Sequence, residues 1–240
     1  MGNSWFRFKQ FTVQQQHNAM KVTTDACLFG ALLPVLPVNP AHKVLDVGTG
    51  TGLLSLMFAQ KNPNAVVEAI EIDEASANEA AENAALSPWK SQIKVLVADA
   101  CHFSPDAQYD FIFSNPPFHQ NQLQSPKAGR KRAHHETELA LDVLVKKIAE
   151  WLTPDGTAMV LLPYYRKMEL LEMLRLSGFE ICQVWNIRSF EHQQPFRCIV
   201  HWGQKAIMTK ENDLVIYQSP NVYTPEASSL LGPFYLRLPD

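Results

Sequence analysis

Short apolar runs alternate with helix-like segments through the middle of the chain. The apolar runs predict buried strands at residues 44–47, 66–72, 93–97, 109–114 and 157–162. The segments between and after them predict helices at residues 53–60, 74–86, 138–152 and 166–176. This order is typical of an α/β fold with an open, mostly parallel sheet that is covered by helices on both faces.

The two ends of the chain follow a different pattern. Residues 6–13 are partly alternating, and residues 26–33 have helical potential before a run of prolines. Two strand-like runs, 179–187 and 196–202, predict an antiparallel hairpin at the sheet edge, and residues 214–217 are also strand-like. We expect one domain over residues 1–240, with an N-terminal lead-in (1–41), a core (42–205) and a C-terminal extension (206–240).

Composition and charge limit the classes of function. The formal net charge of −3 argues against a protein coated in positive charge, so any contact with RNA should be local. The four cysteines form no C-x-x-C pair, and we expect neither a metal site nor disulfides. No apolar stretch approaches the roughly 18–20 residues that span a bilayer, so we expect a soluble, cytoplasmic protein.

A glycine turn follows the first predicted strand. Asp46 precedes Gly48, Gly50 and Gly52, whose spacing is G-x-G-x-G rather than the G-x-G-x-x-G of dinucleotide-binding turns. The Asp46 carboxylate would repel a pyrophosphate but attract the α-amino group of S-adenosylmethionine. Glu71, at the end of the second strand, is placed for the ribose hydroxyls, and Asp99, after the third, for the adenine amine. The alternative is an ordinary tight turn with solvated carboxylates.

A stiff polar loop follows the fourth predicted strand. Asn115 precedes Pro116 and Pro117, neither of which can donate to a sheet ladder or continue as a helix. The Asn115 side-chain oxygen and the Pro116 carbonyl form two acceptors for the two N–H groups of a planar amine. Phe118 can stack on an unpaired base. The alternative is a Pro-Pro turn with Phe118 packed in the core.

These motifs, in this order, resemble class I methyltransferases that act on exocyclic amines. Residues 8–11 and 19–25, with Leu28, Gly30, Tyr223 and residues 234–236, resemble the family of tRNA1(Val) adenine-37 N6-methyltransferases. The resemblance implies a Rossmann-like fold with a seven-stranded, mostly parallel sheet and an antiparallel edge hairpin. It also implies a lead-in that covers the cofactor. The cofactor-binding residues that it implies are Thr24, Asp25, Asp46, Gly48, Gly50, Gly52, Glu71, Asp99 and Asn115.

The target of methylation has several alternatives. Phe118 is followed by His119, a pair also found in guanine-N2 methyltransferases of ribosomal RNA. The amide of a protein glutamine would fit the same two acceptors. A nicotinamide-dependent oxidoreductase and a non-catalytic RNA-binding module are rival classes.

A basic segment lies directly downstream of the Pro-Pro loop. Its cations would bind RNA phosphates, or else form a solvated loop. These cations are Lys127, Arg130, Lys131 and Arg132. We expect a tRNA substrate, a monomer, and neither a membrane nor a metal partner.

Overall fold

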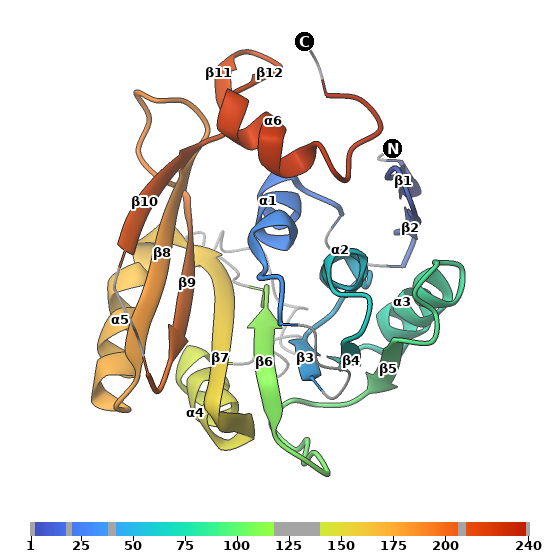
Figure 1. Cartoon of the computed structure of the whole chain (residues 1–240), viewed down its shortest axis with the longest axis vertical. Helices are drawn as coiled ribbons and strands as arrows, with labels where there is room; N and C mark the ends of the chain where they lie inside the picture. The colour runs from blue at the N-terminus through green and yellow to red at the C-terminus, as the bar shows by residue number, and fades with distance from the viewer. Residues whose placement is uncertain (1–2, 18–20, 38–41, 118–139, 206–209, 239–240) are drawn as a thin grey trace, which may run out of the picture.

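The computed structural model describes residues 3–17, 21–37, 42–117, 140–205 and 210–238. An eight-stranded sheet forms its centre (Figure 1). In spatial order the strands are β10 (Lys210–Val215), β8 (Glu180–Arg188), β9 (Arg197–Gly203), β7 (Leu152–Pro163), β6 (Tyr109–Ser114), β3 (Lys43–Val47), β4 (Val66–Glu71) and β5 (Ile93–Val97). The strands β7, β6, β3, β4 and β5 run parallel to one another.

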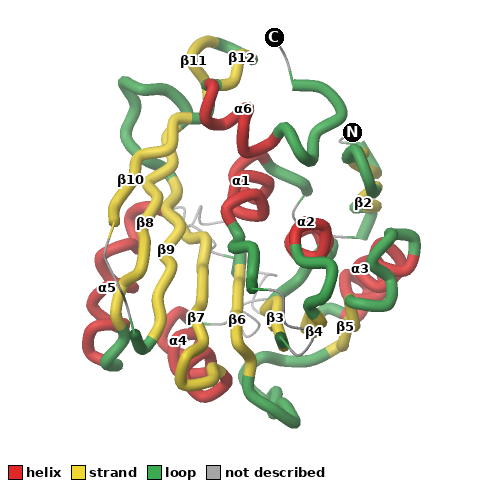
Figure 2. Tube along the Cα trace, viewed as in Figure 1, coloured by secondary structure: helices red, strands yellow, loops and turns green. Residues whose placement is uncertain are grey.

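Helices cover both faces of this sheet (Figure 2). Along β6, Phe111 and Phe113 belong to one hydrophobic cluster and Ile112 to the other, because successive side chains of a strand point to opposite faces. The first cluster includes α1 (Thr24–Leu32) and α2 (Leu53–Lys61), and the second includes α4 (Leu141–Trp151) and α5 (Lys167–Leu176). Helix α3 (Glu74–Ala85) packs beside β4 and β5. The predicted α/β class is therefore confirmed.

The edge of the sheet differs from the prediction. Strand β9 pairs antiparallel with both β7 and β8, which confirms the hairpin. However, β10 adds an eighth strand outside β8, parallel to it, so the hairpin is not the outermost pair. A polar cluster fixes β10 there: the exposed Glu211 accepts hydrogen bonds from the buried side chains of Lys167 (2.5 Å) and Asn186 (2.7 Å). The predicted strand at residues 214–217 overlaps only the end of β10. Because the residues of this cluster lie far apart in the sequence, no local pattern predicted where the strand pairs.

The two ends of the chain lie side by side (Figure 1). An N-terminal hairpin, β1 (Trp5–Arg7) and β2 (Thr12–Gln14), meets the segment after α6 (Pro225–Leu231). Phe8 forms a β-bridge with Tyr235, and the Lys9 amide donates to the Phe234 carbonyl at 2.7 Å. A second short hairpin, β11 (Tyr217–Ser219) and β12 (Val222–Tyr223), precedes α6. The division of the chain at residues 41 and 205 stays a prediction.

Within the described residues, no helix is both long enough and apolar enough to cross a membrane. In the same part of the chain, no group of three or more His, Cys, Asp or Glu side chains is arranged to hold a metal ion.

Candidate active site

The glycine turn joins β3 to α2 in a conformation that requires glycine. Gly48, Gly50 and Gly52 have φ angles of 71°, 54° and 78°, in the left-handed region that side chains disfavour. The amides of Gly48 and Thr49 both donate to the Ile70 carbonyl at the end of β4. A Cβ atom built on Gly48 would meet nothing within 4 Å, so the turn is open on that side. The backbone here is fixed and accessible to a ligand.

Asp46 is a fully buried carboxylate beneath this turn. Its Oδ2 accepts hydrogen bonds from the hydroxyls of Thr49 and Ser55, both at 2.7 Å. Its Oδ1 is buried and has no hydrogen-bond partner among the described residues. Burial raises the pKa of Asp46 to about 6, and the nearby charge of Glu71 adds to this increase. An unpaired buried carboxylate oxygen favours a cationic donor.

Glu71 ends β4 and binds the glycine turn directly. Its Oε2 accepts from the Gly50 amide at 2.9 Å, and its Oε1 accepts from the Asp73 amide at 3.1 Å. Each carboxylate oxygen has a second lone pair, so both can accept a further hydrogen bond. The turn and the carboxylate therefore hold each other in place.

Asp99 follows β5 by two residues. Its Oδ1 accepts from the Cys101 amide, and its Oδ2 lies against His102 Nδ1, both at 2.8 Å. The bond from the Cys101 amide contributes most to lowering the pKa of Asp99, which is therefore ionised at neutral pH. About a third of its side chain is exposed. The carboxylate remains accessible as an acceptor.

The Pro-Pro loop begins where β6 ends, next to β3. The Ser114 hydroxyl is buried and donates to the Val47 carbonyl at 2.7 Å, one residue before Gly48. Asn115 is partly exposed, Pro116 is buried and Pro117 is exposed. Within the described residues, no hydrogen bond engages the Asn115 amide. The start of this loop is thus fixed against the start of the glycine turn, whereas Phe118 lies outside the described residues.

The lead-in residues Thr24 and Asp25 open helix α1. Thr23 caps the helix by accepting from the Ala26 amide, which fixes the orientation of its first turn. Asp25 forms an ion pair with Arg197 at the start of β9 (2.9 Å), and Thr24 hydrogen-bonds Tyr223 of the C-terminal extension. The two predicted cofactor residues therefore connect the lead-in to the sheet and to the C-terminal extension.

Asn83 links the lead-in to the glycine turn, and the motifs did not predict this role. Its Oδ1 accepts from the Gln14 amide (2.8 Å), and its Nδ2 donates to the carbonyls of Gln14 and Thr51 (both 2.9 Å). One turn earlier in α3, Glu79 accepts from the amides of Gln16 and His17. A sequence signal does exist, because Glu79 and Asn83 are four residues apart and share the spacing of the alanines in α3, and the structure buries both.

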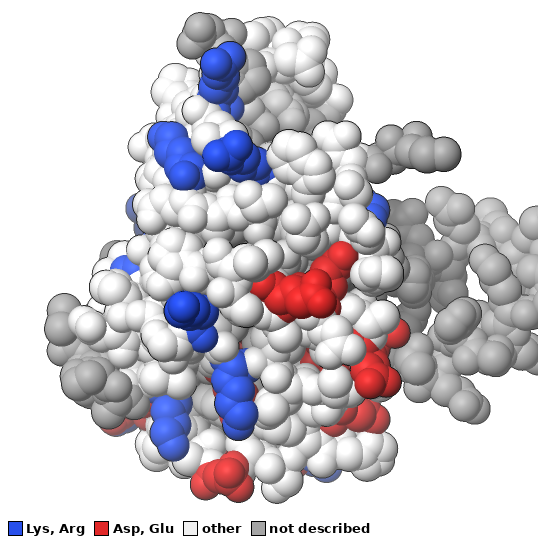
Figure 3. Space-filling model, turned by 90° about the vertical axis from the view of Figure 1, so that its right-hand side faces the viewer, with Lys and Arg blue, Asp and Glu red and all other residues white. Residues whose placement is uncertain are grey.

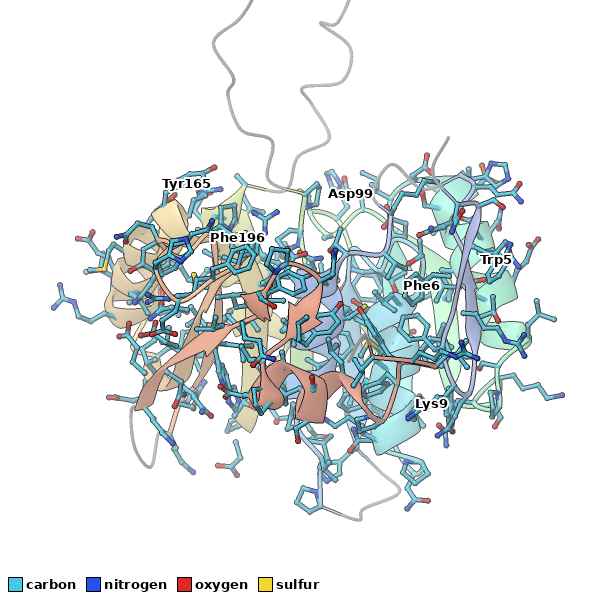
Figure 4. The ribbon with its side chains drawn as sticks, turned by 90° about the horizontal axis from the view of Figure 1, so that it is seen from above. Trp5, Phe6, Lys9, Asp99, Tyr165 and Phe196 are labelled. Carbon is cyan, nitrogen blue, oxygen red and sulfur yellow. The ribbon has the colours of Figure 1, made fainter. Side chains whose placement is uncertain are left out.

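Figure 4 places Asp99, Phe196 and Tyr165 along one long side of the molecule. The pairing of β6, β3, β4 and β5 brings Asn115, the glycine turn, Glu71 and Asp99 to the same edge of the sheet. The predicted RNA-binding residues Lys127, Arg130, Lys131 and Arg132 lie outside the described residues.

Comparison with known proteins identifies the family. Residues 29–169 match the family model described as "Methyltransferase small domain". The protein named tRNA1(Val) (adenine(37)-N6)-methyltransferase of Pedobacter heparinus is 36% identical over 96% of this chain and 97% of its own. The protein of the same name from Phocaeicola vulgatus is 37% identical, over 99% and 100%.

A solved structure supports the fold alone. A predicted O-methyltransferase from Agrobacterium tumefaciens superimposes with a TM-score of 0.67 at 18% identity, covering 87% of this chain and 96% of that one. The fold, the matched domain and the relatives that match over nearly the full length agree. The chain belongs to the methyltransferase small-domain family and, within it, to the family of tRNA1(Val) (adenine(37)-N6)-methyltransferases.

Proposed function

We propose that this protein transfers a methyl group from S-adenosylmethionine to the exocyclic N6 amine of adenosine 37 in tRNA1(Val). The observation that carries the proposal is the fixed start of the Pro-Pro loop, where Ser114 binds the carbonyl of Val47 beside the glycine turn. This bond couples the loop proposed to hold the amine to the turn proposed to hold the cofactor. Membership of the family supports the choice of adenine and of tRNA.

The residues present fit this cofactor. The unpaired Oδ1 of Asp46 suits its α-ammonium group, and Glu71 has lone pairs for the ribose hydroxyls. Asp99 would accept from the adenine amine, and the open side of Gly48 lets a ligand approach the backbone. Gly50, Gly52, Thr24, Asp25 and Asn115 complete the proposed cofactor-binding set. When bound, the cofactor supplies a methyl group on a sulfonium, which is a good leaving group.

The chain's own contribution is to position the amine. Asn115 Oδ1 and the Pro116 carbonyl accept hydrogen bonds from the two N–H groups of the amine, which favours the pyramidal nitrogen that attacks a methyl group. Pro117 stiffens the loop, and Phe118 stacks on the base. Because an exocyclic amine is a weak nucleophile, alignment supplies much of the acceleration and no strong base is needed.

Contacts with RNA would be local. The basic residues that we propose for the phosphates are Lys127, Arg130, Lys131 and Arg132. Figure 3 shows Lys and Arg side chains spread from top to bottom over the face that carries the N-terminal hairpin and α3, with most of its Asp and Glu side chains toward the right of the view. We propose that the protein acts as a monomer, in the cytoplasm, without a metal ion.

Deletion of the gene in the organism that carries it tests this function. Bulk tRNA and ribosomal RNA from the deletion strain are digested separately, and the methylated nucleosides are compared with those of the parent. We expect N6-methyladenosine to disappear from tRNA and to return when the gene is restored. Loss of N2-methylguanosine from ribosomal RNA instead, or no change in any nucleoside, would refute the assignment.

A further inference from the structure

The order of the strands divides the candidate site into two halves. The glycine turn, Glu71 and Asp99 follow β3, β4 and β5, all on one side of β6. On the other side, β7 ends at Pro163, and Arg197, the first residue of β9, pairs with it. Because Asn115 directly follows β6, between the two halves, the half formed by β7 and β9 is left for the substrate.

Two exposed aromatic side chains lie on this second half. Tyr165 is 64% exposed in the short helix η1 (Tyr164–Arg166) after β7, and Phe196 is 41% exposed just before β9. The Tyr164 amide donates to the Phe196 carbonyl at 3.1 Å, so the two segments are joined. Figure 4 shows both residues on the same long side as Asp99.

The position of these rings is unusual within the described residues. Most of the large hydrophobic side chains that are exposed there are aliphatic and scattered, and only Trp5, Tyr165 and Phe196 are aromatic. Trp5 belongs to the N-terminal hairpin, whereas the other two lie where η1 meets the start of β9, at the end of β7. Exposed rings beside a site for a single-stranded base offer π-faces on which neighbouring bases stack.

A cation adjoins the two rings. Arg197 follows Phe196 directly and binds Asp25 through Nε at 2.9 Å. A guanidinium carries further N–H donors on its two terminal nitrogens, which suit a phosphate. An aromatic pair beside an arginine matches the base and the phosphate of one nucleotide strand better than it matches an apolar partner.

We propose that Tyr165 and Phe196 stack on nucleobases next to the target adenosine, and that Arg197 contacts the phosphate between them. This inference rests on the proposed function, because it assigns the flanking RNA to the same site. It gives Tyr165 and Phe196 a role in binding RNA and none in binding the cofactor.

Binding of a short RNA to the full chain tests the inference. The probe is a fluorescent 17-nucleotide anticodon stem-loop of tRNA1(Val), unmodified at position 37, and anisotropy is measured with saturating S-adenosylhomocysteine. Tyr165→Ala and Phe196→Ala should each raise the Kd for RNA about 5- to 150-fold. The matched control is Leu176→Ala, at an exposed apolar residue that ends α5. It should leave the Kd within about two-fold.

Three further measurements separate stacking from other effects. The Kd for S-adenosylhomocysteine should be unchanged in the Tyr165 and Phe196 variants, and the dependence of RNA affinity on salt should keep its slope, because a lost stacking contact removes no ion pair. Methyl transfer at saturating RNA should also be nearly unchanged, so that KM rises while kcat persists.

Each outcome decides the proposal. Leucine keeps apolar bulk but lacks the aromatic ring. If Tyr165→Leu binds RNA as tightly as the unaltered protein does, the stacking proposal is wrong, and this test holds even if Phe196→Ala fails to fold. If the unaltered protein binds and methylates the stem-loop but both ring variants do so equally well, only this inference fails. If the unaltered protein does neither, the proposed function fails and the inference with it.

Discussion

The Ser114 hydroxyl donates a hydrogen bond of 2.7 Å to the backbone carbonyl of Val47, and both groups are buried. Val47 and Ser114 are also direct neighbours in the register of β3 and β6. The hydrogen bond therefore joins the last residues of two parallel strands, at the edge of the sheet where both strands end. After β3 the backbone continues as the glycine turn and after β6 as the Pro-Pro loop, so this bond holds the starts of the two segments together.

Ser114→Ala should reduce both stability and turnover. The substitution removes the donor of a buried hydrogen bond, which costs about 1–2 kcal/mol of the free energy of unfolding. It also frees the start of the Pro-Pro loop, so kcat/KM should fall more than the affinity for the cofactor. Urea unfolding and steady-state kinetics measure these effects, and Ser104→Ala, at an exposed serine, is the control. Unchanged kcat/KM would show that this bond does not position the loop.

Glu71→Ala should lower the affinity for the cofactor at least about ten-fold, because it removes the proposed ribose acceptor and the partner of the Gly50 amide. Glu71→Gln keeps one side-chain oxygen and should lose less. Isothermal titration with S-adenosylhomocysteine measures both, and Glu74→Ala is an exposed acidic control three residues away. Equal affinity in Glu71→Ala and Glu74→Ala would rule out the proposed role.

Asp46 should give stability a distinctive pH dependence. Burial raises its pKa from 3.8 to about 6. Between these values the folded protein binds the proton more tightly than the unfolded chain, so this contribution stabilises at low pH and is lost as the pH rises through about 6. Relative to Asp46→Asn, the free energy of unfolding should fall by about 2–3 kcal/mol from pH 4 to pH 7. A constant difference between the two proteins across this range would contradict the assignment.

The affinity for the cofactor should have the opposite pH trend. Below about pH 6 the Asp46 carboxyl is neutral and no longer attracts an α-ammonium group. The Kd for S-adenosylhomocysteine should therefore rise as the pH falls through 6 in the unaltered protein, and it should be higher and flatter with pH in Asp46→Asn. If both proteins show the same pH profile, another group must bind the amine.

Asn83 should hold the lead-in against the glycine turn. Asn83→Asp is nearly isosteric, but it replaces two donors with an oxygen that faces the carbonyls of Gln14 and Thr51. We expect a loss of about 2–4 kcal/mol of stability and faster hydrogen exchange of the Gln14 amide. Asn78→Asp, at an exposed position of the same helix, should change neither. Protected exchange at Gln14 in Asn83→Asp would argue against this clamp.

Local sequence patterns predicted those elements of the fold whose conformation depends on residues close together in the sequence. Apolar runs predicted β5 and β6 with the bounds that the structure has. The run of β6 is nearly continuous because this central strand is buried on both faces. The glycine turn was recognisable because its left-handed φ angles require glycine at each position. The strand-like residues 214–217 indicated the end of β10, but the place of β10 in the sheet and the clamp of Asn83 were not predicted, since both depend on hydrogen bonds between residues 25–69 positions apart.

The site was predictable in position but not in detail. Asp46, Glu71 and Asp99 were expected as ligands from their places at strand ends, and the structure puts them at one edge of the sheet. That Glu71 and Asp99 each accept backbone amides was not foreseen, because such bonds depend on the path of the following turn. The role of Ser114 was not foreseen either, because its contact with Val47 depends on the register of β3 and β6.

Methyl transfer by Asn115 variants tests the central claim most directly. Purified protein is mixed with unmodified tRNA1(Val) and S-adenosylmethionine carrying a labelled methyl group, and N6-methyladenosine at position 37 is quantified in single turnovers. Asn115→Leu should lower the rate at least about 10²- to 10³-fold with the Kd for S-adenosylhomocysteine within a few-fold, and Asn115→Asp, which keeps a side-chain acceptor, should retain more activity. Transfer by Asn115→Leu at the rate of the unaltered protein would contradict the account.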